Sequence, residues 1–292
     1  MTRPPEPRHD AIQLRTAAPA PPKRSLSQNF LVDRNTATAI VTAAAIQPSE
    51  SVLEIGPGRG ALTFGLAEAA ARLVAVERDD ALAPWLAEQL ASHGDRVRII
   101  HADVLEADLA ALLAPPGPWV VVGNLPYAIT TPILLKLLQH ARRFDRAIVM
   151  VQREVAQRWC AGPGSRTYGA ITVWCQYHCS CRVLRKVRPS CFRPSPSVES
   201  ALVELRPHSD ALPRARDEAL LQQVTRAAFG QRRKRAATSL AACRVLPLAR
   251  EEWEALFREC GIDGRSRAED ISVSQYVALS DAAGRARGAS GP

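Results

Sequence analysis

Residues 51–63 read SVLEIGPGRGALT, a short apolar run that passes directly into a glycine-rich turn. The run Ser51–Ile55 is typical of a buried strand, and the residues after the turn, Phe64–Ala71, are compatible with a helix. Glycines between a strand and a helix let a ligand approach the backbone closely, near a helix start whose amide groups attract a carboxylate or a phosphate. The stretch therefore predicts an α/β domain with a nucleotide-binding unit.

Acidic residues follow the next two apolar runs. Leu73–Val76 ends at Glu77, whose separation from Gly56 is close to the ~20 residues expected in a nucleotide-binding unit. Val97–Ile100 is followed shortly by Asp103. Because the carboxyl ends of parallel strands meet at one edge of a sheet, we expect both side chains at that edge. Glu77 is placed to accept hydrogen bonds from ribose hydroxyls, and Asp103 from an adenine amine.

A fourth apolar run, residues 120–123, ends in the corner Asn124-Leu125-Pro126-Tyr127. The exocyclic amine of adenine is a poor nucleophile because its lone pair is delocalised into the ring. The side-chain oxygen of Asn124 and the backbone carbonyl of Leu125 could accept its two hydrogens and favour a pyramidal nitrogen. Pro126 offers no competing N–H, and Tyr127 can stack on the base, a contact worth about 1–3 kcal/mol. The alternative is a strand followed by an ordinary turn.

The glycine turn alone leaves a second enzyme class open. Gly56, Gly58 and Ala61 also satisfy the glycine template of dinucleotide-dependent enzymes, which makes a dehydrogenase a serious competitor. The Asn124–Tyr127 corner separates the two classes, since a hydride transferase has no evident use for it.

The order and spacing of these segments resemble those of the ribosomal RNA adenine dimethyltransferases. The matching segments of the first half are Ser27-Gln28-Asn29-Phe30-Leu31, Glu54-Ile55-Gly56-Pro57-Gly58-Arg59-Gly60, Glu77, Asp103 and Asn124-Leu125-Pro126-Tyr127. Those of the second half are Val151–Ala156, Pro163–Ser165, Tyr168-Gly169, Phe192–Pro196, Val198–Ser200 and Phe229–Lys234. The resemblance covers about residues 25–280. It weakens at Arg235–Leu240, where similar proteins commonly continue with Thr-Leu-Arg-Asn.

The resemblance implies a Rossmann-like class I methyltransferase sheet with helices on both faces, plus a small C-terminal helical domain. It implies transfer of methyl groups from S-adenosyl-L-methionine to two adjacent adenines in a hairpin loop near the 3′ end of small-subunit rRNA, in ribosome biogenesis. The residues that would hold the cofactor are Asn29, Leu31, Gly56, Glu77, Asp103 and Asn124. The target adenine would be held by Asn124, Leu125, Pro126 and Tyr127, with Phe192 as a second stacking face.

Two alternatives stay open at this point. Macrolide-resistance methyltransferases carry out the same chemistry on large-subunit rRNA, although the loop Pro163–Gly169 looks more like the small-subunit type. A non-catalytic RNA-binding or assembly factor could retain the fold, but the presence of Asn124 and Glu77 argues against it.

Charge points to a polyanionic partner. The chain of 292 residues has a net charge of +9, and 47% hydrophobic residues support a genuine core. The basic residues form two clusters, Arg182, Arg185, Lys186, Arg188 and Arg193, and Arg226, Arg232, Arg233, Lys234 and Arg235. Such clusters are typical of a surface that follows RNA phosphates. A solvated helix face is the alternative for the second cluster.

The seven cysteines do not form a recognisable metal site. Cys175, Cys179 and Cys181 lie close together, but no second pair completes a tetrahedral zinc site, and we expect no metal. The odd number of cysteines and the absence of a secretory segment favour reduced thiols in a cytoplasmic protein. We find no membrane-spanning run, and nothing requires more than a monomer.

The expected domains are a flexible tail at 1–24, a methyltransferase domain at 25–206, a helical rRNA-binding domain at 207–284 and a flexible tail at 285–292. Helices are expected at Asp33–Ala45, from Pro132 with Thr131 as its N-cap, and at about 215–229, 249–260 and 267–282, the last with a capping box of Ser266 and Glu269. The stretches Ile171–Tyr177, Arg182–Val187 and Ser200–Leu205 are expected to complete the sheet.

Overall fold

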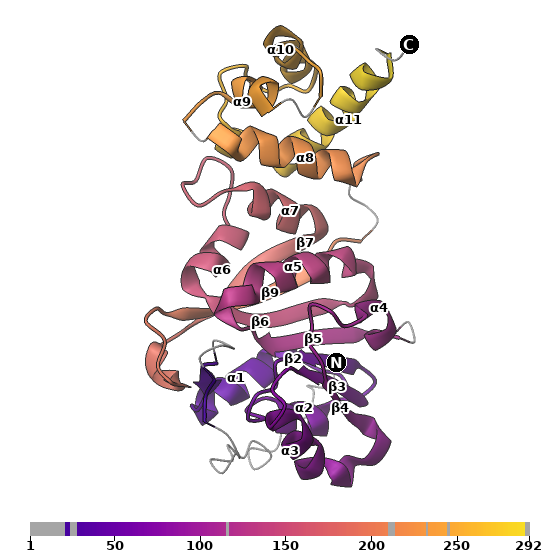
Figure 1. Cartoon of the computed structure of the whole chain (residues 1–292), viewed down its shortest axis with the longest axis vertical. Helices are drawn as coiled ribbons and strands as arrows, with labels where there is room; N and C mark the ends of the chain where they lie inside the picture. Colours follow the sequence, from indigo (N-terminus) through magenta and orange to yellow (C-terminus); the bar gives the residue numbers. More distant parts are fainter. Residues whose placement is uncertain are drawn as a thin grey trace, which may run out of the picture. The chain divides into compact units, whose positions relative to one another are not determined.

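The computed structural model describes residues 21–23, 28–114, 117–209, 214–231, 233–243 and 246–289. Ser27 and Arg232, which belong to the motifs above, lie outside the described residues, as do most of the expected N-terminal tail and residues 290–292. The chain divides into two compact units. The first comprises Met1–Ala156 and Cys179–Pro207, and the second Gln157–His178 and His208–Pro292 (Figure 1).

The first unit is built on a mixed sheet, which has seven strands within the described part of the chain. Their order is β4-β3-β2-β5-β6-β9-β7, in which β9 runs antiparallel to both neighbours and the other pairs are parallel. The strands are β2 Ser51–Ile55, β3 Arg72–Glu77, β4 Val97–His101, β5 Trp119–Asn124, β6 Arg146–Gln152, β7 Cys179–Val187 and β9 Ser200–Pro207. A separate antiparallel pair joins β1 Phe30–Leu31 to β8 Phe192–Arg193.

Helices cover both faces of the sheet. The helices of this part of the chain are α1 Arg34–Ala44, α2 Thr63–Ala69, α3 Leu82–Gln89, α4 Leu109–Leu112, α5 Thr130–Gln139 and α6 Arg153–Trp159. Val52 and Val122 belong to one apolar cluster with residues of α1 and α2. Ile55 faces the other way, because side chains alternate along a strand, and it lines a hollow together with Ile133 of α5. The expected class of fold is confirmed.

The strand order reverses between β2 and β5. From β2 the chain builds outward through β3 and β4, and then continues on the other side of β2 with β5 and β6. The register places Ile55 opposite Gly123, so Gly56 and Asn124 stand at neighbouring strand ends. Glycine is needed at position 123, since a Cβ there would lie 2.7 Å from the backbone oxygen of Ile55. Open α/β sheets bind their ligands at such a reversal, outside the carboxyl ends of the strands.

Helix α1 is held at both ends. Asp33 caps its first turn by accepting a backbone N–H at 2.7 Å. At the other end, Arg146 of β6 donates to the backbone oxygens of Ala44 and Ala45 at 2.8 and 2.9 Å. The same guanidinium donates to both carboxylate oxygens of Glu50 at 2.7 Å. These contacts fix α1 beside the sheet and confirm the helix expected there.

The second unit is helical. Its helices are α7 Ala170–His178, α8 Glu218–Ala228, α9 Ala236–Cys243, α10 Arg250–Glu259 and α11 Val273–Ala289. They enclose an apolar cluster whose largest members include Tyr168, Trp253, Phe257 and Tyr276. A small helical C-terminal part was expected, and α9 is a helix that the sequence patterns did not reveal.

The expectation of a strand at Ile171–Tyr177 was wrong, because this stretch forms α7. Its β-branched and aromatic residues are typical of a strand, but Val173 and Tyr177 are four residues apart and both enter the helical cluster. The Thr172 side chain also accepts the Gly169 N–H at 3.0 Å, which holds the first turn. Tertiary packing here outweighs local propensity.

The last helix also begins later than expected. Ser266 and Glu269 do not cap it; α11 starts at Val273, and Ser272 and Gln275 exchange hydrogen bonds across its first turn. It continues to Ala289, into the segment expected as a tail. Residues 157–178, which we expected in the methyltransferase domain, pack with the C-terminal helices. Helix α5 begins at Thr130, so Pro132 is its third residue and not its first.

Candidate active site

Three adjoining hollows open around Gly56, which lines all of them. The first hollow includes Arg78, Asp103 and Ile133 in its lining, the second Asn29, Glu77 and Tyr127, and the third Leu31, Glu54 and Arg59. Asn124 lines the second and the third. The backbone of Gly56 has a φ of +68°, a conformation that favours glycine and brings bare backbone to the cavity. The structure thus brings together the residues that the sequence proposed for the cofactor.

Asn124 is oriented by a hydrogen bond to the backbone of Asn29. Its Nδ2 donates to the backbone oxygen of Asn29 at 3.1 Å. A carbonyl oxygen can only accept, so the amide nitrogen must face Asn29 and the acceptor Oδ1 is on the other side of the amide. The predicted role of Asn124 requires an acceptor in this position.

The remaining residues of the corner surround the second hollow. Leu125, Pro126 and Tyr127 all line it. The Tyr127 hydroxyl is 2.5 Å from the Ser200 Oγ, a contact that holds the half-buried ring in place. Burial raises the pKa of Tyr127, so its hydroxyl stays neutral. A neutral, anchored ring at a cavity wall suits stacking on a base.

Glu77 ends β3 and turns its carboxylate toward the glycine turn. Its two oxygens accept the backbone N–H groups of Gly58 and Asp79, each at 2.8 Å. Each carboxylate oxygen can accept a further bond, which leaves Glu77 able to hold hydroxyl groups. Burial raises the pKa of Glu77, while the two backbone donors act in the opposite direction.

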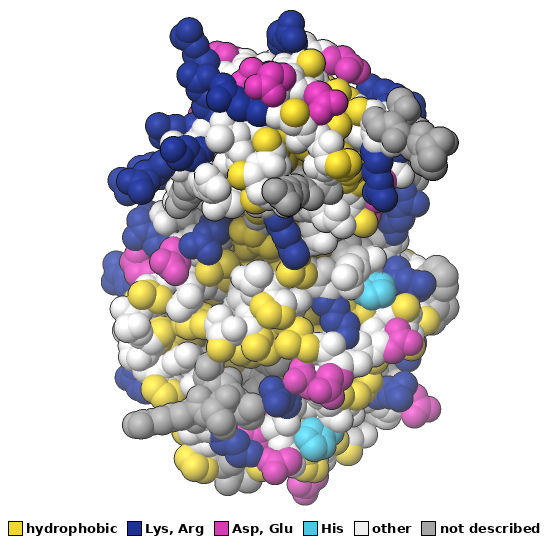
Figure 2. Space-filling view, turned by 45° about the horizontal axis from the view of Figure 1, so that its top comes forward, with side chains coloured by type: hydrophobic (Ala, Val, Ile, Leu, Met, Phe, Trp, Pro, Cys, Tyr) yellow, Lys and Arg dark blue, Asp and Glu magenta, His cyan; other side chains and the backbone are white. Residues whose placement is uncertain are grey.

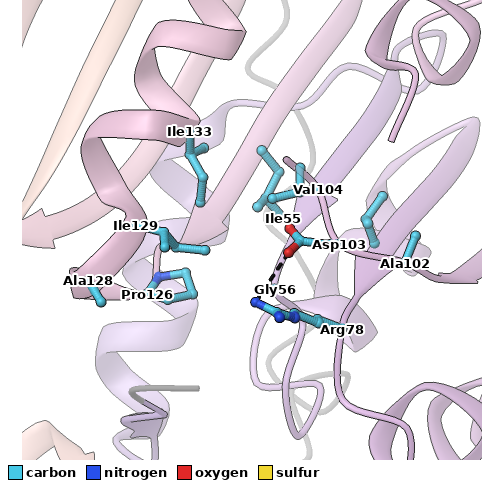
Figure 3. Close-up of a pocket in the computed structure, with 11 residues that line it drawn as sticks. Ile55, Gly56, Arg78, Ala102, Asp103, Val104, Pro126, Ala128, Ile129 and Ile133 are labelled. Carbon is cyan, nitrogen blue, oxygen red and sulfur yellow. Dashed lines mark ion pairs between the residues drawn. The ribbon is translucent and has the colours of Figure 1, made fainter. Parts of the chain in front are cut away.

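Asp103 faces the first hollow from the opposite side to α5 (Figure 3). Its Oδ1 accepts the Leu105 N–H at 2.9 Å, and its Oδ2 pairs with the Arg78 guanidinium at 3.1 Å. Figure 3 shows the aliphatic side chains of Ile129 and Ile133 across the hollow from this pair. The first hollow therefore combines an apolar wall with a polar one, as a flat heteroaromatic ring requires.

The segment that carries Asn29 is fastened by Asp79. The Asp79 side chain is fully buried and accepts the Lys23 Nζ at 3.0 Å and the Gln28 Nε2 at 2.8 Å. Burial of Asp79 opposes its ionisation, but these hydrogen bonds hold its pKa below the ordinary value. An ionised Asp79 thus keeps the segment before β1 over the second hollow.

Comparison with known proteins agrees with this geometry. The family model of the ribosomal RNA adenine dimethylases matches residues 21–284. A protein of Geobacillus thermodenitrificans named ribosomal RNA small subunit methyltransferase A is 43% identical over 267 residues, which cover 89% of this chain and 90% of that protein. A protein of the same name from Clostridium perfringens is 38% identical over 259 residues, with the same coverage. The chain belongs to the ribosomal RNA adenine dimethylase family.

Solved structures show the same fold. A dimethyladenosine transferase from Plasmodium falciparum has a TM-score of 0.74 and 22% identity, with 86% of this chain and 95% of that one covered. The 23S rRNA methyltransferase ErmE has a TM-score of 0.68 and 28% identity, with 88% and 100% covered. Like these dimethylases and their structural relatives, the chain is a class I methyltransferase.

Phe192 is the one predicted site residue that the structure does not bring to the hollows. It pairs with Leu31 between β1 and β8, is fully buried in the cluster beside α1, and is absent from the linings of the three hollows. Its role as a second stacking face stays a prediction.

The described residues of both basic clusters are exposed. In the first cluster, Arg182 already pairs with Glu204 of β9 at 2.8 Å, while Arg185 and Lys186 lie exposed on β7, the edge strand of the sheet. In the second, Arg226, Arg233, Lys234 and Arg235 are exposed, and Arg232 lies outside the described residues. Figure 2 shows Lys and Arg side chains gathered over the part formed by the C-terminal helices.

Sequence reasoning assigned no site role to three charged residues that line the hollows, Arg78, Glu54 and Arg59. Arg78 directly follows Glu77 and could have been suspected from that position alone. Glu54 is a carboxylic acid within an otherwise apolar strand, which is the signal that could have found it. No group of three or more His, Cys, Asp or Glu in the described ranges is arranged to hold a metal ion, and no helix there is long and apolar enough to cross a membrane.

Proposed function

We propose that this chain is a cytoplasmic enzyme of ribosome biogenesis that dimethylates the exocyclic amines of two adjacent adenines in a hairpin loop near the 3′ end of small-subunit rRNA, using S-adenosyl-L-methionine. The observation that carries the proposal is the orientation of Asn124. Its Nδ2 is held by the Asn29 carbonyl at 3.1 Å, so its Oδ1 is available as an acceptor at the strand end beside Gly56. Relatives named small subunit methyltransferase A support the choice of rRNA.

The residues around Gly56 fit the cofactor. Asp103 suits an adenine amine beside the apolar wall of Ile129 and Ile133, and Glu77 retains accepting capacity for two ribose hydroxyls. The Oε2 atom of Glu54, in the third hollow, is buried and has no hydrogen-bond partner among the described residues. When bound, the cofactor supplies a methyl group activated by a sulfonium, so the reaction needs no metal and no nucleophile from the protein.

The protein contributes position and electrostatics. The Asn124 Oδ1 and the Leu125 carbonyl would accept the two hydrogens of the target amine, which localises the nitrogen lone pair. The Tyr127 ring would hold the base by stacking after it has left its own stack, a step that costs a few kcal/mol and is least costly in a loop. Pro126 adds no competing donor. A second transfer requires that the singly methylated amine present its remaining lone pair in the same pocket.

Exposed basic residues provide the RNA contacts in this proposal. Arg185 and Lys186 on β7, with Arg188 beyond it, form one set, and the exposed members of the second cluster form another. Arginine and lysine on RNA phosphates supply affinity and its salt dependence, while the hairpin loop supplies the accessible bases. A monomer is sufficient for these contacts.

The experiment is to map modified nucleotides on ribosomes from cells with and without the protein. The proposal expects two adjacent dimethyladenosines in small-subunit rRNA that disappear with the gene and return with the wild-type protein but not with Asn124→Ala. Loss of a methylated adenine from large-subunit rRNA instead would assign the chain to the alternative function, the same chemistry on large-subunit rRNA. Unchanged modification of both subunits would refute the proposal.

A further inference from the structure

Glu54 is a buried acid for which the mechanism above has no use. It lies in the middle of the sheet on β2, between Ala75 of β3 and Val122 of β5, and its side chain is 1% exposed. Within the part of the chain that the structure describes, its Oε2 has no hydrogen-bond partner, although the side chain lines the third hollow. A buried acceptor without a donor is costly, so this oxygen is suited to a ligand that brings a donor.

The charged and polar groups around Glu54 do not neutralise it. From β3, Glu77 repels a charge on Glu54, and from α2 the Thr63 hydroxyl favours one. Arg59 lines the same hollow, and its guanidinium lies 4.6 Å from the centre of the Phe30 ring. Burial is the largest influence and raises the pKa of Glu54 to about 8. At pH 7 the neutral carboxyl therefore predominates before a ligand binds.

In the proposed binding mode, each of the three hollows holds one part of the cofactor. Asp103 takes the adenine in the first and Glu77 the ribose in the second, which leaves the third for the amino-acid end. That end carries an α-ammonium group with three donors, whereas the sulfonium has no hydrogen to donate. Asn124 borders both the second and the third hollow, so the methyl group between ribose and amino acid would lie near it.

We propose, on the basis of the function proposed above, that Glu54 is the counter-ion of the cofactor's α-ammonium group and releases a proton to solvent when the cofactor binds. The neutral carboxyl loses its O–H proton to buffer, and the resulting carboxylate accepts a hydrogen bond from the ammonium. A nearby positive charge favours the ionised form, which reverses the effect of burial.

The test is calorimetry of S-adenosylhomocysteine binding at pH 7 in buffers of different ionisation enthalpy. This ligand has the same amino-acid end, and the slope of observed enthalpy against buffer enthalpy counts the protons released. We expect close to one proton for the wild type and none for Glu54→Gln, whose affinity should fall by at least about tenfold. Methylthioadenosine, which lacks the amino acid, should bind both proteins within about twofold and shows that the variant site is folded.

The outcomes separate this inference from the proposed function. If the wild type does not bind S-adenosylhomocysteine, the cofactor assignment itself fails. Binding without proton release, or release that persists in Glu54→Gln and so belongs to Glu77, would overturn the inference alone. Equal weakening of both ligands by Glu54→Gln would also overturn it, since the effect would then not involve the ammonium.

Discussion

At Asn124 a single hydrogen bond distinguishes an active-site residue from a turn residue. Asn and Pro after a strand are common in turns, and the sequence could not exclude that alternative. The structure supplies what was missing, because the Asn29 carbonyl fixes which end of the Asn124 amide is the acceptor. That information depends on two residues 95 positions apart and is not present in either motif.

Glu77 can be tested through cofactor binding alone. Glu77→Ala should raise the dissociation constant of S-adenosylhomocysteine by at least about tenfold, because hydrogen bonds to a charged group are worth about 1.5–3 kcal/mol each. Isothermal titration provides the measurement. Glu68→Ala is the matched control, since its carboxylate on α2 is 61% exposed, and it should bind like the wild type. An unaltered constant in Glu77→Ala would remove Glu77 from the site.

Tyr127 offers a test that separates the ring from the hydroxyl. Tyr127→Ala should lower kcat/KM for the rRNA substrate by about 5- to 150-fold, because stacking is worth about 1–3 kcal/mol per base. Tyr127→Phe keeps the ring and loses only the contact with Ser200, so its loss should be much smaller. Ser200→Ala should match Tyr127→Phe. Equal losses for the Ala and Phe variants would mean that the ring does not stack.

Among the elements, α1 is anchored to the inner strand β6 through Arg146, which also pairs with Glu50. Arg146→Met should lower the free energy of unfolding by about 3–5 kcal/mol, because it leaves Glu50 buried without its partner. Both side chains of this pair are only 8% exposed. Chemical denaturation measures the change. Arg250→Met, which breaks an exposed i,i+4 pair with Glu254, should cost less than about 1 kcal/mol.

The same pair gives a pH dependence with a defined sign. Burial disfavours the charge of Glu50, but the hydrogen bonds from Arg146 and from the Gln47 N–H hold its pKa below the ordinary 4.5. A lowered pKa in the folded state contributes stability above pH 4.5 and loses it as the pH falls through the folded value. The stability difference between wild type and Arg146→Met should therefore shrink below pH 4.5. A difference that stays constant to pH 3 would contradict this assignment.

The elements predictable from sequence were those with strong local patterns. The strands β2, β3 and β5 each bury an uninterrupted run, and Gly56 marks the turn after the first of them. The prediction of a strand at residues 171–177 failed because the helix there depends on the apolar cluster it shares with residues more than 40 positions away, such as Leu221 and Tyr276. The start of α11 was predicted wrongly because two capping patterns lie six residues apart, and the structure uses Ser272 with Gln275 and not Ser266 with Glu269.

In both units, the feature that indicates RNA binding is the cluster of exposed basic residues, and not the fold. Replacing Arg185 and Lys186 together by Ala should weaken binding to the rRNA substrate and reduce the slope of log affinity against log salt by about 1.5. Filter binding at several salt concentrations measures it. Arg182→Ala should have a smaller effect, because Glu204 already neutralises that guanidinium. An unchanged salt slope in the double variant would show that β7 carries its basic residues only as an exposed edge strand.

The helical character of the second unit was predictable from the sequence, but the packing of residues 157–178 with its C-terminal helices was not. Net charge and helical periodicity indicated a basic helical part after residue 207, whereas residues 157–178 join it only through the apolar cluster that includes Tyr168 and Val173. No local sequence pattern indicates that residues 157–178 pack with the C-terminal helices.

The most direct measurement is mass-spectrometric counting of dimethyladenosine in small-subunit rRNA after incubation with the purified protein and S-adenosylmethionine. The wild type should form two dimethyladenosines per rRNA. Asn124→Ala should form none, while its affinity for S-adenosylhomocysteine falls only moderately. Full methylation by Asn124→Ala would contradict the role of the Asn124–Tyr127 corner.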